Sequence, residues 1–171
     1  MDEVSGQDVA ALGVSHDNLR ALVLLPLAYV AAASRRRDLA LLDRLIDNSA
    51  RVAQLDDGAE ELAHHWLRHV PTRREFQHGL GLLRSACESN AGRLTMRDLL
   101  ESVLWAGSAA QLDRERIGRR YTSVSMSARR AIGELETVLG IEMGQLWSDV
   151  LDELGDDLPR STNFIPPRLH T

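Results

Sequence analysis

The sequence predicts an all-α fold, a single compact bundle of about seven helices, and three observations support this prediction. The stretch from Ala21 to Ala33 is apolar at every position apart from Pro26 and the hydroxyl of Tyr29. A helix without a polar face must be enclosed by other elements. The later stretches carry apolar residues on one side only, and none shows the regular alternation of a strand. We therefore expect a central apolar helix, beginning near Leu19, with amphipathic helices around it.

The start of the chain gives this first helix its boundaries. Residues 1–15 form a polar lead without a sustained pattern, and we expect it to be flexible. Ser15 and Asp17 offer caps for the helix that follows. Pro26 either kinks that helix or lies in its first turn, if the helix begins just before the proline. Three arginines end the apolar stretch, where the helix dipole favours cations: Arg35, Arg36 and Arg37.

Six further helices follow from apolar residues at helical spacing and from capping signals. Thr72 with Glu75, and Thr95 with Asp98, have the spacing of N-terminal caps closed by an acidic residue three positions later. Ser125 or Ser127 caps a later helix. The expected helices run from Asp38 to Gln54, to about His69, after Thr72, after Thr95 to Gly107, up to Gly140, and from Glu142 to Leu154.

Two segments lack a clear helical pattern. Residues 108–125 are rich in arginine and poor in apolar side chains, and a helical turn at Leu112–Ile117 is the most regular structure that they suggest. After Gly155, three prolines punctuate a polar tail that should not fold alone. We therefore divide the chain into a lead at 1–15, a helical domain at 16–155 and an extended tail at 156–171.

Composition and charge restrict the function. The net charge of −5 argues against non-specific binding of nucleic acid, which needs a basic surface. The single cysteine, Cys87, excludes an internal disulfide and favours a reducing compartment. The apolar stretch is shorter than the ~20 residues of a membrane span, and the region before it is acidic, unlike that of a signal peptide. We therefore expect a cytoplasmic protein.

Three segments carry a resemblance to a known family: LAYVAAA at residues 27–33, LLESVLWAG at 99–107 and VLGI at 138–141. They are similar to two apolar helices, and to the end of the second repeated unit, in the TerB-like family. This family comprises helical domains named for tellurite resistance and related to the N-terminal region of some membrane-associated J-domain proteins. The resemblance covers roughly residues 19–155 and implies a TerB-like helical bundle.

The chain departs from that family where the family has acidic loops of the form A-D-G-x-I-x-x-x-E. Ser34-Arg35-Arg36-Arg37-Asp38 follows the first helix, and an arginine-rich insertion follows the second, while Ala128 stands near the position of the second glutamate. Hard divalent cations need clustered oxygen ligands, and neighbouring arginines would repel such cations. The resemblance therefore implies a bacterial, non-catalytic protein-interaction or stress-associated module that has lost those metal sites.

Two candidate contact surfaces follow from the residues. The arginines of the two repeated units could form a basic surface for phosphates, lipid head groups or an acidic protein. The alternative is charge complementarity at helix ends and salt bridges to Asp38, Asp113 and Glu115. The tail offers apolar anchors that could dock into a groove on this or another chain, or strap across their own domain. The basic residues are Arg35, Arg36, Arg37, Arg114, Arg116, Arg119 and Arg120, and the anchors are Phe164, Ile165 and Leu169.

Metal binding remains as an alternative function. Glu61, His65 and His69 form a row along one helix face that could hold zinc, although the row lacks a firm fourth ligand. Two E-x-x-H spacings, Glu61 with His64 and Glu75 with His78, are typical of di-iron helical bundles and suggest a di-iron oxidoreductase as a third function. Both lie off the apolar stripes of their helices, so we expect them to face solvent.

Catalytic motifs are weak in comparison. Cys87 falls on an apolar helix face without a neighbouring histidine, which indicates a buried, inert thiol. No glycine-rich loop follows a strand, and no spacing links serine, histidine and aspartate into a triad. We therefore expect a protein that is not an enzyme, holds no cofactor and binds another protein, an anionic ligand or a membrane surface. The oligomeric state stays open.

Overall fold

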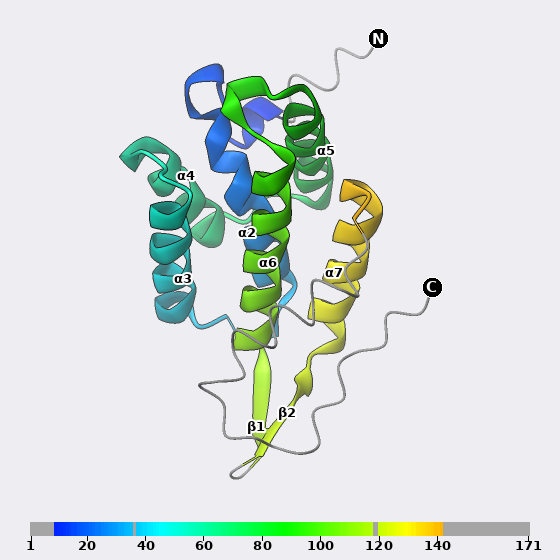
Figure 1. Ribbon diagram of the computed structural model, residues 1–171. Coiled ribbons are helices and arrows are strands. Elements are labelled where there is room, and N and C mark those ends of the chain that lie inside the picture. Colours follow the sequence, from blue (N-terminus) through cyan, green and yellow to red (C-terminus); the bar gives the residue numbers. More distant parts are fainter. Residues whose placement is uncertain (1–8, 36, 118–119, 142–171) are drawn as a thin grey trace.

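The computed structural model describes residues 9–35, 37–117 and 120–141, and it describes residues 114–117 and 120–124 by their backbone. This part of the chain is helical apart from one two-stranded hairpin (Figure 1). The prediction of a helical bundle is confirmed. The elements are η1 (His16–Leu24), α2 (Leu25–Ala33), α3 (Leu39–Val52), α4 (Asp57–Arg68), α5 (Arg73–Ser89), η2 (Ala91–Arg93), α6 (Met96–Leu112), β1 (Arg114–Ile117), β2 (Arg120–Val124) and α7 (Met126–Leu139).

The apolar stretch near the N-terminus is buried at every residue from Ala21 to Ala31. It consists of the end of the 3-10 segment η1, followed by α2, which begins at Leu25 and places Pro26 in its first turn. A proline is tolerated there because the first N–H groups of a helix have no partner within that helix. α2 contacts η1, α4, α5, α6 and α7. Figure 1 shows α2 and α6 side by side, with α3 and α4 on one side and α5 and α7 on the other.

Both expected caps with acidic partners are present. The N–H of Glu75 donates to Oγ1 of Thr72 at 3.2 Å, and the N–H of Thr72 donates to Oε2 of Glu75 at 2.6 Å. Thr95 and Asp98 cap α6 in the same reciprocal manner. Side-chain oxygens of Asp38, Asp56 and Ser125 cap the remaining three amphipathic helices. Each cap satisfies an N–H group that the helix itself leaves without a partner.

The hairpin corrects the expectation for residues 108–125. α6 continues to Leu112, and in place of the helical turn that Leu112–Ile117 could form, β1 begins at Arg114 and pairs antiparallel with β2. Tyr121, Thr122 and Val124 have side chains that favour strands over helices. The strands pair only with one another, so neither shows the long alternation that identifies a strand in a sequence.

Asp113 fixes the base of this hairpin. Its side chain is buried, and its Oδ2 accepts hydrogen bonds from the hydroxyl of Ser125 and from the N–H of Arg35 at 3.1 Å. One carboxylate therefore joins the start of β1, the residue after β2 and the segment that follows α2.

Other expectations fall outside the described residues: residues 1–8 of the lead, the helix at 142–154 and the tail at 156–171. In the described part of the lead, Leu12 and Val14 are buried. Among the helices that are described, none combines the length and the apolar character that crossing a membrane requires.

Two glycines of α5 give a stability test. A Cβ at Gly79 would lie 2.5 Å from Cδ2 of Leu25 and 2.6 Å from Cδ1 of Leu12, whereas a Cβ at Gly81 would meet nothing within 4 Å. Leu12 and Leu25 are fully buried, so neither can move aside freely. We expect Gly79→Ala to lower the free energy of unfolding by about 1–2 kcal/mol through overpacking. We expect Gly81→Ala to raise it by about 0.5–1 kcal/mol through reduced backbone entropy of the unfolded chain. Urea unfolding measures both, and equal effects would contradict the packing.

Candidate functional site

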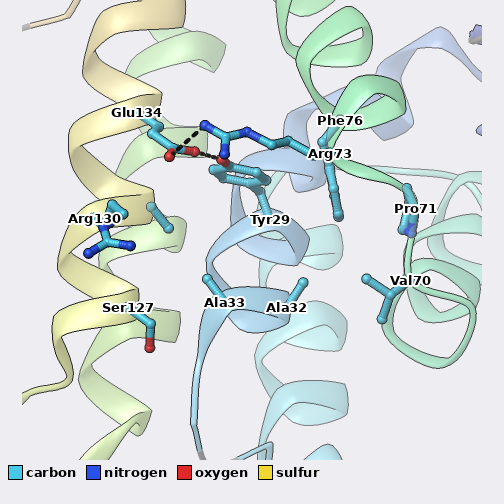
Figure 2. A pocket seen from close by; sticks show the side chains of 11 residues that line it. Tyr29, Ala32, Ala33, Val70, Pro71, Arg73, Phe76, Ser127, Arg130 and Glu134 are labelled. Atoms are coloured by element: carbon cyan, nitrogen blue, oxygen red, sulfur yellow. Dashed lines mark hydrogen bonds and ion pairs between the residues drawn. The ribbon is translucent and has the colours of Figure 1, made fainter.

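A groove of about 310 Å³ lies between α2, α7 and the start of α5 (Figure 2). Its apolar surface comes from all three helices and from the loop before α5, and polar side chains line the α5 and α7 sides. The rings of Tyr29 and Phe76 meet edge to face, with 5.1 Å between their centroids. The lining residues are Tyr29, Ala32, Ala33, Val70, Pro71, Arg73, Phe76, Ser127, Arg130, Ala131 and Glu134.

Glu134 is the polar centre of the groove. Its Oε2 accepts a hydrogen bond from the hydroxyl of Tyr29, and its Oε1 accepts one from Nη2 of Arg73 at 2.9 Å. These bonds join α2, α5 and α7, as the dashed lines in Figure 2 show. Both oxygens have a partner, and the positive charge of Arg73 offsets the charge of the carboxylate. Glu134 is therefore engaged in holding the groove together.

Arg130 differs from Arg73 in having no such partner. It lies one turn before Glu134 on α7, lines the same groove and is exposed (Figure 2). Within the described ranges, its guanidinium makes no hydrogen bond or ion pair with another side chain. The groove therefore presents an uncompensated positive charge beside an apolar surface.

A second polar cluster lies on the hairpin of α3 and α4. Nδ1 of His64 is 2.6 Å from Oδ1 of Asp43, and Nε2 of His64 is 2.7 Å from Oδ1 of Asp47. Glu60 places Oε1 at 3.8 Å from the same Nε2. Both ring nitrogens of His64 therefore face a carboxylate oxygen, one on Asp43 and one on Asp47.

The charges of this cluster influence one another. The hydrogen bond from Arg68, whose Nη2 is 2.7 Å from Oδ2 of Asp43, is the main cause that lowers the pKa of Asp43, with a further contribution from His64. The contact with Asp47 raises the pKa of Glu60, and desolvation adds to the effect. Asp43 therefore has a cationic partner, whereas Asp47 and Glu60 are carboxylates held close to one another.

This cluster differs from the metal ligands expected from the sequence. Glu61, His65 and His69 are all exposed, and the rings of His65 and His69 stack on one another with 4.4 Å between centroids. In the described part of the chain, the set of three potential ligands that converges is Asp47, Glu60 and His64. Sequence reasoning noticed neither aspartate. The available signal was a pair at i and i+4 on each of two successive helices, Asp43 with Asp47 and Glu60 with His64.

The residues of the di-iron hypothesis do not converge in the described structure. Glu75 caps α5 through Thr72, Glu61 is exposed, and His64 lies against the carboxylates of α3. Glu61 is exposed as expected, whereas His64, Glu75 and His78 are half-buried, so the expectation that all four face solvent is wrong for these three.

The predicted arginines that the structure describes have different surroundings. The backbone N–H of Arg35 contacts Asp113, which precedes Arg114, so the two arginine-rich segments approach one another at this point. Arg37 donates to the carbonyl of Leu67 at the C-terminal end of α4, where a cation complements the helix dipole. The backbones of Arg114, Arg116 and Arg120 lie in the hairpin. Arg36, Arg119 and the anchors Phe164, Ile165 and Leu169 lie outside the described residues.

Cys87 is buried, with 1% of its surface exposed, and burial raises the pKa of its thiol to about 11. A thiol reacts as its thiolate, so this cysteine is unsuited to act as a nucleophile near neutral pH. The expected inert thiol agrees with this position.

The contact between Tyr29 and Glu134 leads to a prediction on stability. Tyr29→Phe removes a hydrogen bond from a buried ring to a charged acceptor, and we expect the free energy of unfolding to fall by about 1–2 kcal/mol. A double-mutant cycle with Glu134→Gln, measured by urea unfolding, should give a coupling energy of similar size. The exposed pair Arg97–Glu101 is the control, and its coupling should stay below about 1 kcal/mol. Equal coupling in both pairs would contradict the role of Tyr29.

The raised pKa of Cys87 leads to a prediction on alkaline stability. The thiol of the unfolded chain ionises from about pH 8.5, whereas the folded protein retains the proton until about pH 11. Between these values the folded state binds more protons, so stability must fall as pH rises. We expect urea unfolding between pH 8 and 10.5 to show this decline and Cys87→Ala to make it shallower. An unchanged slope in the variant would disprove the assignment.

Comparisons with known proteins add no family to these observations. No protein-family model matches the chain, and no curated protein or solved structure matches it. The features that bear on function are therefore the geometry of the groove and that of the α3–α4 cluster.

Proposed function

We propose that this chain is a non-catalytic protein-interaction module that holds an acidic, partly apolar segment of another protein in the groove between α2, α5 and α7. The uncompensated guanidinium of Arg130 beside the apolar surface of the groove carries this proposal. A matching segment has a carboxylate for Arg130 and an aliphatic or aromatic side chain for the surface formed by Val70, Pro71 and Phe76.

The size and openness of the groove support a short peptide segment as the ligand. Ligand pockets range from about 300 to 1,000 Å³, and the volume of about 310 Å³ lies at the lower end. Such a groove accommodates a few side chains of a partner, while the rest of the partner lies across the surface. An apolar contact supplies affinity, and the charge pair fixes orientation.

The polar groups in the groove favour binding over catalysis. Both oxygens of Glu134 are hydrogen-bonded, to Tyr29 and Arg73, so this carboxylate holds α2, α5 and α7 together. The hydroxyl of Ser127 lies 3.1 Å from that of Ser125, and no histidine lines the groove beside it. A hydroxyl without a neighbouring base is a weak nucleophile.

The resemblance to TerB-like domains supports the same conclusion from the sequence. We include in the proposal that the chain is a cytoplasmic, stress-associated TerB-like bundle built around its apolar helix. Arginine-rich segments stand where the family has acidic loops, which favours contact with a partner over the metal binding of those loops.

Selection from a random peptide library displayed on phage tests the proposal with the purified full chain. We expect enrichment of peptides that combine Asp or Glu with a neighbouring aromatic or aliphatic residue. Arg130→Glu should weaken binding of the selected peptides at least ~10-fold in calorimetry, because it replaces attraction by repulsion. Arg44→Glu is the matched control, since Arg44 is exposed on α3 and does not line the groove.

Two outcomes would overturn the proposal. One is selection of the same peptides, with the same affinity, by the Arg130→Glu protein. The other is failure of the native protein to enrich any sequence pattern. This result counts when Arg130→Glu and Arg44→Glu have the same circular dichroism spectrum as the native protein.

A further inference from the structure

Asp47, Glu60 and His64 converge on one point from two helices. The side chains come from α3 and α4, and one potential donor atom of each lies within 4.8 Å of the other two. They are Nε2 of His64 and one carboxylate oxygen of each acid. The point lies beside α3 and α4, whereas the groove lies between α2, α5 and α7, so this cluster is separate from the proposed peptide site (Figure 1).

The histidine is held in the orientation that a metal ligand needs. Its Nδ1 faces Oδ1 of Asp43 at 2.6 Å, and Arg68 holds the other oxygen of Asp43 at 2.7 Å. A carboxylate that accepts the Nδ1 proton fixes the ring and leaves Nε2 as the coordinating atom, which is the usual outer-shell arrangement around a metal-bound histidine. The half-buried ring of His64 therefore presents Nε2 toward Asp47 and Glu60.

The charges at this point favour a cation. Asp43 is offset by Arg68, which leaves the carboxylates of Asp47 and Glu60 beside one another without an arginine of their own in the described contacts. A divalent cation would neutralise both carboxylates and remove their repulsion.

We propose that Asp47, Glu60 and His64 form a Zn²⁺ site that joins α3 to α4, with Asp43 as the residue that positions the imidazole. One imidazole and two carboxylates suit zinc, whereas Mg²⁺ and Ca²⁺ prefer oxygen ligands throughout. Zinc holds such ligands at about 2.0–2.2 Å, so the ligand atoms lie roughly 3.4 Å apart. The present distances from Nε2 of His64 lie on either side of that spacing, at 2.7 Å to Oδ1 of Asp47 and 3.8 Å to Oε1 of Glu60. Water completes the coordination, and any proton on Nε2 leaves to solvent when the metal binds.

Calorimetric titration of the full chain with ZnCl₂, after removal of metals by a chelator, tests the site. We expect one equivalent to bind, and an excess of Mg²⁺ or Ca²⁺ not to compete. His64→Gln, Glu60→Gln and Asp47→Asn should each weaken binding at least ~10-fold. Asp43→Asn should weaken it by about 10–100-fold as a change outside the ligand set. The visible spectrum of bound Co²⁺ should lose intensity in the ligand variants and shift in Asp43→Asn.

The same helix supplies the controls. Glu61→Gln, His65→Gln and His69→Gln change the row that the sequence suggested, and we expect them to leave the affinity for Zn²⁺ unchanged. Thermal unfolding by circular dichroism checks that each variant folds, and Zn²⁺ should raise the midpoint for the native protein but not for Glu60→Gln, whose mutated side chain lies near the surface.

Three results would overturn the site. The first is absence of binding to the native protein at ~100 μM Zn²⁺, a concentration that corresponds to about −5.5 kcal/mol. The second is loss of binding in His65→Gln or His69→Gln with retention in Glu60→Gln, which would assign zinc to the exposed row. The third is equal affinity in all variants, which would indicate adventitious binding only. None of these results bears on the peptide groove, because Arg130 is absent from this cluster.

Discussion

Burial of the segment from Ala21 to Ala31 is the constraint on which the arrangement of the other helices depends. The segment has no polar face, so any side left in water would expose apolar surface, at a free-energy cost of about 25 cal/mol per Å². η1 and α2 are therefore covered by α4, α5 and α6, and α7 covers α2 further. The hydroxyl of Tyr29 is the side-chain polar group that this segment carries inward, and a buried polar group needs a partner. Glu134 supplies it, and Arg73 supplies the counter-charge, so one packing requirement also builds the wall of the groove.

The features that the sequence predicts well are those fixed over short distances along the chain. Amphipathic stripes, the Thr72–Glu75 cap and the Thr95–Asp98 cap depend on residues within one or two helical turns. The hairpin after Asp113 was missed for a related reason. In the described structure its sheet has two strands of four and five residues, so their pattern is too short to separate from a helical turn.

The candidate sites were beyond sequence reasoning because their members meet only after the helices pack. Tyr29 and Glu134 are 105 positions apart, and His64 and Asp43 are 21 apart. The run of arginines at 35–37 is conspicuous in the sequence, yet the side chain of Arg37 donates a hydrogen bond to a carbonyl at the C-terminal end of α4. Arg130 lies in an ordinary amphipathic helix. It becomes a candidate because Glu134 binds Arg73, so that among the described residues Arg130 has no counter-charge. The environment of an arginine, more than its clustering, determines which cation is available to a ligand.

The groove and the α3–α4 cluster are separate sites, but one helix connects them. α4 carries Glu60 and His64, and the chain that leaves α4 passes directly through Val70 and Pro71, which line the groove. α4 also packs against α2, whose Ala32 and Ala33 line the same groove. Coupling between two sites requires an element whose position both ligands influence, and it must act equally in both directions. In the described structure α4 borders both candidate sites, because Glu60 and His64 belong to it and the residues after its C-terminal end line the groove.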